Sequence, residues 1–323
     1  MTLPTGDDVA AAARRIAPHI VRTPLLRSPH LDQITGGTVL IKAEPLQKTG
    51  SFKFRGATNS VLQLTQAQRE AGVVAFSSGN HGQALACAAA AAGVKSTIIM
   101  PTDAPAIKVA STREWGATIM HYDRLTDDRE QVAAAFIAKT GATLIAPFDY
   151  APTIVGQGTA ALEAIQDALA QGLVMEDFLV CTGGGGFVAG CALAAERFSP
   201  TTKVHSVEPE GWDDHARSLI AGERLSNPPG GSPLCDSLLA PMPGKLTFQI
   251  NQRLLGAGVV VTDEDVYAAM RFAFLRLKVV VEPGGAVALA AVLSGKFDAR
   301  GKVVGIVLSG GNVDPAVFER ALH

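Results

Sequence analysis

The stretch VVAFSSGNHGQALACAAAAA, residues 73–92, changes character halfway along. Its first residues are apolar and β-branched, as in a buried strand, and its last residues are alanine-rich, as in a helix. The polar turn SSGNHG joins the two parts. Because a buried strand that leads through a tight turn into a helix is the repeating unit of α/β sheets, this stretch predicts an α/β fold.

The same alternation continues on both sides of this stretch. Further strands are predicted at 38–44, 96–100, 118–122, 177–181, 204–208, 259–262 and 303–309. Helical periodicity covers 81–92, 128–139, 154–170 and 263–278. We therefore expect mostly parallel, twisted sheets flanked by helices on both faces.

Composition narrows the possible functions. A chain of 323 residues with 47% hydrophobic residues is long enough for two domains. Its 28 basic and 30 acidic side chains form no basic block, so a nucleic-acid partner is not expected. The N-terminus lacks a signal-peptide pattern and no apolar run reaches membrane-span length, which predicts a cytoplasmic protein without membrane contact. The four cysteines lie apart in apolar sequence and are expected to be reduced core residues.

Three unusual turns follow predicted strands: 77–83, 182–186 and 309–312. In open α/β sheets, ligands bind beyond the carboxyl ends of the strands, where such turns lie. The glycine run of the second turn precedes a predicted helix, so its free amides favour an anion such as a phosphate. It matches neither a Walker A loop nor a dinucleotide fingerprint, and a merely tight turn is the alternative interpretation.

The first turn suits a carboxylate. Ser78 can cap the following helix, and the first helical amides can then face a substrate carboxylate. A simple N-cap is the alternative, but it gives Asn80 and His81 no purpose.

A lysine provides the reactive group. In TGSFKFRGA, residues 49–57, Lys53 lies between two phenylalanines and beside Arg55. Desolvation and a neighbouring cation both lower a lysine pKa toward nucleophilic use, although most lysines are simply solvated. A reactive amine and a phosphate-binding loop without a nucleotide signature together suggest pyridoxal phosphate held as a Schiff base.

These motifs resemble the serine/threonine dehydratase and serine racemase family of fold type II pyridoxal-phosphate enzymes, which share a tryptophan synthase β-like fold. The resemblance extends over RTPL at 22–25, the segment 42–57, SSGNHG at 77–82, GQGT at 156–159, the glycines at 183–186, and SGGN at 309–312. It implies a large cofactor-binding domain of residues 1–71 and 150–323, a small mobile domain of residues 72–149, and a homodimer.

The resemblance also implies individual roles. Lys53 would hold the cofactor, Phe52 would lie against it, Asn80 would contact the ring hydroxyl, and Ser309 would face the pyridine nitrogen. Its phosphate would be held by Gly183, Gly184, Gly185 and Gly186. Lys53 and Ser78 would be bases on opposite faces of the α-carbon, and the substrate would contact Ser77, Ser78, Asn80, His81 and Arg129.

Two assignments have a plain alternative. In racemase-like relatives, positions matching Glu208 and Asp214, with a carbonyl matching that of Trp212, bind Mg²⁺ or Ca²⁺, which prefer such oxygen ligands. A solvated acidic turn would explain the same residues. Arg129 matches an arginine near the substrate, yet it also suits an exposed helix surface.

The predicted activity is a dehydratase, or ammonia-lyase, that converts L-serine or L-threonine to an α-keto acid and ammonia. A serine racemase or a 3-hydroxyaspartate dehydratase on the same scaffold is the alternative, favoured if Arg129 reaches into the pocket. Hydroxyaspartate enzymes often read MGAFK where this chain has TGSFK, which favours serine or threonine. From another class, a phosphometabolite sensor would use the glycine loop without covalent chemistry.

Overall fold

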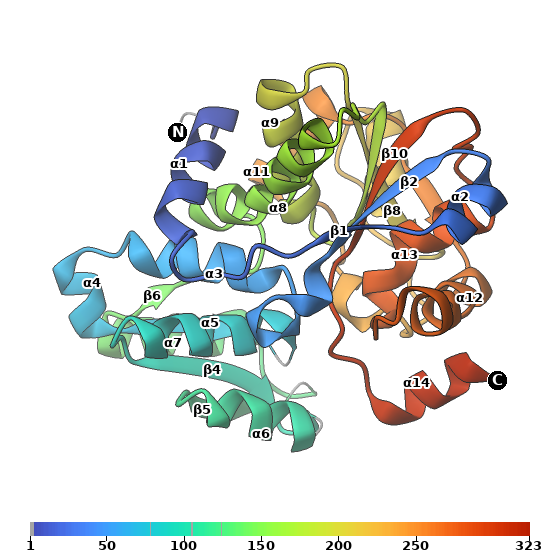
Figure 1. Ribbon diagram of the computed structural model, residues 1–323. Coiled ribbons are helices and arrows are strands. Elements are labelled where there is room, and N and C mark those ends of the chain that lie inside the picture. Colours follow the sequence, from blue (N-terminus) through green and yellow to red (C-terminus); the bar gives the residue numbers. More distant parts are fainter. Residues whose placement is uncertain (1–2, 78, 105, 124) are drawn as a thin grey trace.

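The computed structural model describes residues 3–77, 79–104, 106–123 and 125–323, and it contains two sheets flanked by helices (Figure 1). The larger sheet has six strands, in the order β1 (Leu25–Arg27), β2 (Thr38–Ala43), β10 (Val303–Leu308), β7 (Asp177–Cys181), β8 (Lys203–Pro209) and β9 (Val259–Val261). All neighbouring pairs are parallel except β1 and β2, which are antiparallel. The predicted α/β class with mostly parallel sheets is confirmed.

The smaller sheet comes from one continuous segment. Its order is β5 (Thr118–Tyr122), β4 (Ser96–Pro101), β3 (Val73–Phe76) and β6 (Thr143–Leu144), all parallel. Alternate strand residues face opposite sides, so Ala75 joins the core with helix α5 (Asn80–Ala91), whereas Val74 joins the core with α7 (Arg129–Thr140). Strand β6 has only two residues, too few for the sequence pattern to reveal it.

Helices fill the remaining layers. Their bounds are α1 (Gly6–Ile16), α2 (Pro29–Thr35), α3 (Lys53–Leu62), α4 (Gln66–Ala71), α6 (Ala106–Glu114), α8 (Ala151–Ala170), α9 (Gly186–Phe198), α10 (Asp214–Ala221), α11 (Lys245–Leu254), α12 (Asp263–Phe272), α13 (Pro283–Leu293) and α14 (Pro315–Leu322). Thr262 caps α12 through a capping box, which fixes its start. The helix predicted to continue to Lys278 ends earlier, since a π-helical turn spans Ala273–Leu277 and Lys278 takes a φ of 60°.

The core of the larger sheet is packed with small residues. Helices α8 and α9 lie against each other on one side of this sheet, and α13 lies on the other (Figure 1). A Cβ on Gly158 of α8 would lie 2.4 Å from the carbonyl oxygen of Gly190 of α9, so the two helices need glycine at this crossing. Within the described chain all four cysteines are buried and free, as predicted, and none of the helices is long and apolar enough to cross a membrane.

A buried ion cluster joins the parts that carry the site. Arg55 of α3 bonds Glu44 and Glu163, with nitrogen–oxygen distances of 2.8 Å, and Lys42 of β2 bonds Glu163 at 2.7 Å. Burial lowers the pKa of Lys42, while the hydrogen bonds from Arg55 hold the pKa of Glu163 below its usual range despite burial. Two cations and two anions therefore fix α3 against β2 and α8. The division into a large and a small mobile domain stays a prediction.

Candidate active site

The three predicted turns and Lys53 meet around one cavity of about 550 Å³. Its lining includes residues from the three turns, from the segment around Lys53 and from the start of α7: Phe52, Lys53, Ser77, Asn80, His81, Arg129, Gly183, Gly184, Gly185, Gly186 and Ser309. Ser78 lies outside the described residues, so its predicted role stays a prediction. The cavity lies where the carboxyl ends of β3, β7 and β10 lead into the turns, as expected for an open α/β sheet.

Backbone pairing brings Lys53 close to the end of β10. The Phe52 amide donates to the Ser309 carbonyl over 3.0 Å, and Ser51 forms a β-bridge with Gly310. The Asn312 side chain also donates to the Thr49 carbonyl, 2.8 Å away. Two segments that lie far apart in sequence are thereby joined, and Lys53 follows immediately as the first residue of α3.

The Lys53 amine has the environment of a reactive lysine. Its Nζ donates to the Pro147 carbonyl over 2.9 Å and lies 5.0 Å from the centre of the Phe52 ring. Burial lowers its pKa to about 8. The second cause expected from the sequence was wrong, because Arg55 points into its ion cluster with Glu44 and Glu163 rather than toward Lys53.

The glycine loop is shaped so that only glycine fits. Gly185 caps α9 with a φ of 87°, and a Cβ on Gly184 would lie 2.4 Å from the Phe148 ring. Two carbonyls of the loop point to α11: the Thr247 hydroxyl donates to Gly184 over 2.8 Å, and the Asn251 amide donates to Gly185 over 3.2 Å. In a trans peptide the N–H points opposite to the C=O, so the amides of Gly185 and Gly186 point away from α11. Free amides at a helix N-terminus suit a phosphate.

A flat apolar wall and two polar groups complete the cavity. The ring of Phe52 stacks on that of Phe187, with centres 3.9 Å apart. Asn80 is held from both ends, since it donates to Glu282 over 2.6 Å and accepts from Asn312 over 2.7 Å. Ser309 is buried and lines the cavity together with Cys181. An amine, a phosphate-binding loop and this wall fit a phosphorylated aromatic aldehyde such as pyridoxal phosphate.

His81 and Arg129, which the sequence predicted to contact the substrate, both line the cavity. His81 is buried with its Nε2 2.7 Å from the Ile145 carbonyl, and burial, followed by the Lys53 charge, lowers its pKa to about 3. Arg129, the first residue of α7, lines the cavity with its guanidinium 5.2 Å from the centre of the Phe76 ring. Arg129 therefore borders the same space as Lys53, although its side chain is also exposed to solvent.

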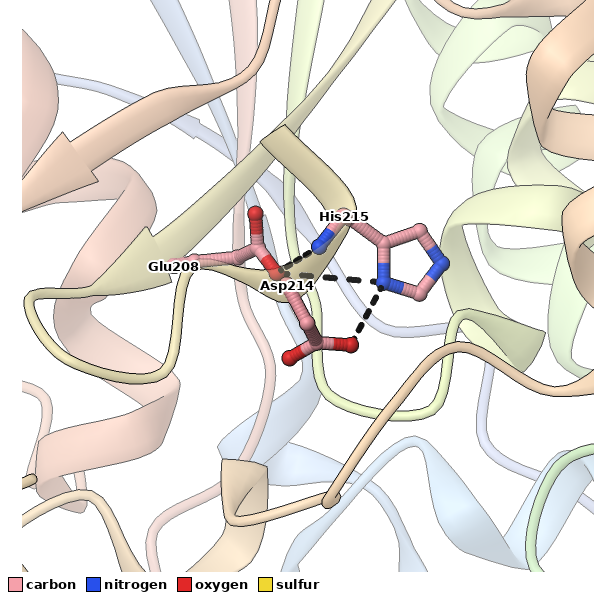
Figure 2. A group of neighbouring side chains, drawn as sticks. All are labelled: Glu208, Asp214 and His215. Carbon is pink, nitrogen blue, oxygen red and sulfur yellow. Dashed lines mark hydrogen bonds and ion pairs between the residues drawn. The ribbon is translucent and has the colours of Figure 1, made fainter. Parts of the chain in front are cut away.

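The acidic turn after β8 divides into two parts. Glu210 is exposed, and Asp213 lies 3.4 Å from Arg217. Glu208 and Asp214, by contrast, are fully buried, and burial, followed by the Asp214 carboxylate, raises the pKa of Glu208 well above its usual range (Figure 2). These two residues do not behave as a solvated turn.

These two carboxylates, with His215 beside them, form a candidate cation site. Glu208 accepts from the backbone amides of His215 and Ala216 at 2.8 Å each, and Asp214 Oδ1 accepts from Asn227 at 2.6 Å. Asp214 Oδ2 is buried and has no hydrogen-bond partner within the described structure. A bound cation would satisfy this oxygen and offset the repulsion between the carboxylates. The role of the Trp212 carbonyl as a third ligand stays a prediction.

Sequence reasoning missed several side chains of the site. His215 has its Nδ1 3.5 Å from Asp214 Oδ2 and 3.8 Å from Glu208 Oε1 (Figure 2). Its only sequence signal is its place directly after Asp214. Glu282 and Phe148 reach the cavity from distant segments, and no local pattern marks them. Asn312 belongs to the predicted turn at 309–312, but no role was predicted for it.

Comparisons with known proteins agree with this geometry. The family described as "Pyridoxal-phosphate dependent enzyme" matches residues 16–310. The chain is 44% identical to an L-threo-3-hydroxyaspartate ammonia-lyase from Pseudomonas sp over 97% of each chain, and 40% identical to the serine racemase of Schizosaccharomyces pombe over 100% of this chain and 98% of the relative. The crystal structure of a T.th. threonine deaminase superposes with a TM-score of 0.90 at 44% identity, covering 96% of this chain and 99% of the other.

Proposed function

Since the chain belongs to the family of pyridoxal-phosphate-dependent enzymes, we propose that it is an ammonia-lyase that eliminates water from a small 3-hydroxy amino acid. L-Serine and L-threonine are the first candidate substrates, and the products are an α-keto acid and ammonia. The observation that carries the proposal is the Lys53 amine, whose pKa is lowered to about 8, in one cavity with the glycine loop and Ser309.

Several residues that line the cavity have a task in the proposed reaction. The cofactor, when bound, supplies an electron sink for negative charge on the substrate α-carbon. The Lys53 amine would hold the cofactor and would also serve as the base that takes the α-proton of the substrate. The glycine-loop amides and the N-terminus of α9 bind the phosphate, and Phe52 packs on one face of the ring.

Ser309 favours elimination. We infer that its hydroxyl faces the ring nitrogen, where a carboxylate would hold a proton on that nitrogen and strengthen the electron sink. A hydroxyl holds that proton much less firmly, so the electron sink is weaker. Negative charge on the α-carbon would then be short-lived, and the β-hydroxyl would leave as water. Racemisation needs a second proton carrier on the opposite face, and Ser78 is the residue proposed for it.

A second candidate substrate follows from Arg129. Its guanidinium borders the cavity, and a guanidinium can bind a second carboxylate through two charge-assisted hydrogen bonds. Serine and threonine have no such group. This observation favours 3-hydroxyaspartate, and two relatives at 44% and 42% identity have the name L-threo-3-hydroxyaspartate ammonia-lyase.

The test of the proposed function uses Lys53→Ala. The purified protein should show the absorbance of a lysine-bound cofactor and form keto acid from serine, threonine or a 3-hydroxyaspartate stereoisomer. The variant should lose both, because Lys53 is the one lysine among the described residues that lines the cavity, and it should keep its circular dichroism spectrum. Lys48→Ala, which changes an exposed lysine in the short turn before α3, is the matched control and should keep both. Keto acid formation at the normal rate by Lys53→Ala would refute the proposal.

A further inference from the structure

His215 lies between the two buried carboxylates and the glycine loop. On one side its Nδ1 is 3.5 Å from Asp214 and 3.8 Å from Glu208 (Figure 2). On the other side its Nε2 is 3.1 Å from Asn251 Nδ2, and the same amide nitrogen donates to the Gly185 carbonyl. The imidazole is fully buried, and a Cβ on Gly185 would lie 2.3 Å from its Nε2. The ring therefore contacts both sites at once.

The hydrogen bonds determine which ring nitrogen of His215 is protonated. The amide nitrogen of Asn251 can only donate, so Nε2 of His215 is the acceptor. An imidazole that accepts at Nε2 has its proton on Nδ1, which faces Asp214 and Glu208. A protonated nitrogen cannot bind a cation, so His215 directs an N–H toward the two carboxylates, at 3.5 and 3.8 Å, rather than serving as a ligand. The cation site is left with oxygen donors, which suit Mg²⁺ or Ca²⁺ better than zinc.

Asn251 acts on the part of the loop that holds the anion. It is buried on α11, and its bond to the Gly185 carbonyl orients the peptide whose N–H belongs to Gly186. Gly186 is the first residue of α9, so this N–H lies at the anion-binding end of the helix. A small movement of His215 therefore reaches a phosphate-binding amide through one intermediate side chain.

We propose that His215 and Asn251 form a relay that couples cation binding between Glu208 and Asp214 to the affinity of the glycine loop for the cofactor phosphate. The relay rests on the cofactor and cation of the proposed function. A cation draws the two carboxylate oxygens toward itself and shifts their attraction for the Nδ1 proton of His215. The ring then repositions Asn251 and, through it, the Gly185–Gly186 peptide. His215 and Asn251 are positioning residues, since neither reaches the substrate.

Coupling of this kind must be reciprocal. If the cation tightens cofactor binding by some factor, the cofactor tightens cation binding by the same factor, typically about 5- to 150-fold. The Ca²⁺ dissociation constant should therefore be lower for the holoenzyme than for the same protein after removal of pyridoxal phosphate. The ratio of the two dissociation constants measures the coupling, and this measurement does not depend on enzyme turnover.

The test measures this ratio by titration calorimetry in matched variants. Asn251→Ala removes the link to Gly185 without touching the carboxylates, and we expect Ca²⁺ still to bind but the ratio to fall to within about twofold of one. Gln252→Ala removes the neighbouring side chain of α11, which is exposed and donates to Gly222, and should keep the wild-type ratio. If Asn251→Ala does not fold, Asn251→Ser and His215→Gln replace it.

The outcomes separate the relay from the proposed function. A wild-type ratio near one, an unchanged ratio in Asn251→Ala and its substitutes, or no Ca²⁺ binding to either form would each overturn the relay. Keto acid formation and cofactor absorbance, measured on the same preparations, test the proposed function by themselves. Turnover without coupling would refute only the relay, and coupling without turnover would refute only the lyase assignment.

Discussion

Lys53 differs from an ordinary lysine because of where α3 begins. As the first residue of that helix it follows a segment that is fastened to the end of β10, so its amine is directed into the cavity rather than into solvent. Burial then disfavours the charged form. The result is an amine with a pKa of about 8, against an ordinary value of 10.5, and a larger uncharged fraction at neutral pH.

This shift predicts a pH dependence for cofactor uptake. The uncharged amine is the nucleophile, so the rate at which pyridoxal phosphate binds to the cofactor-free protein should rise with pH and level off above about pH 8. An unshifted lysine would keep gaining rate toward pH 10.5. Stopped-flow absorbance across this range, with free Nα-acetyllysine as the reference amine, distinguishes the two. A rate that still rises steeply above about pH 9.5 would show that Lys53 is solvated in solution.

Arg129 allows a substrate-specific prediction. Arg129→Ala should lower kcat/KM for 3-hydroxyaspartate by roughly 1.5–3 kcal/mol, the scale of hydrogen bonds to charged groups, and change the value for serine much less. Lys139→Ala removes a cation from the other end of α7 and is the control. Equal losses with both substrates would assign Arg129 to folding or closure, and no loss with either would make it a surface residue.

At the scale of elements, the sequence predicted features that depend on consecutive residues and missed contacts between residues that lie far apart in the sequence. Strand and helix periodicity identified β3, β4, β5 and α8 because one repeating pattern covers each of them. It placed the end of α12 too late, since a π-helical turn keeps helical composition while changing the hydrogen bonds. The glycine loop was recognisable because its chemistry lies in consecutive residues. His215, Glu282 and Asn251 were not, because folding alone brings them to their partners.

The ion cluster under α3 gives an element-scale prediction. Glu163→Gln would leave Lys42 and Arg55 facing Glu44 alone in the core, and breaking a buried pair in this way costs about 3–5 kcal/mol of the free energy of unfolding. Asp167→Asn, on the same helix but in an exposed pair with Arg22, should cost at most about 1 kcal/mol. Urea unfolding measures both values. Equal costs for the two variants would mean that the cluster contributes no more than a surface pair.

At the scale of the whole molecule, the proposed cation should stabilise the fold. Only the native state holds Glu208 and Asp214 together, so Mg²⁺ or Ca²⁺ at about 100 times its dissociation constant should add about 2.7 kcal/mol. Chelation should lower the melting temperature and added cation should restore it. Glu208→Gln should remove this response, and Glu210→Gln, in the exposed part of the same turn, should keep it. If chelator leaves the melting temperature of the wild-type protein unchanged, a bound structural cation is ruled out.

The smaller sheet is made by a single segment whose two ends meet. The Thr143 amide donates to the Gly72 carbonyl over 2.9 Å, so the chain leaves and re-enters the rest of the molecule at neighbouring points. This segment, which includes α5 and α7, supplies Ser77, Asn80, His81 and Arg129, whereas Lys53, the glycine loop and Ser309 come from elsewhere. The residues proposed to contact the substrate therefore come from one continuous stretch of the gene. A chimera that exchanges residues 73–144 between relatives with different substrates would test whether this stretch determines the substrate.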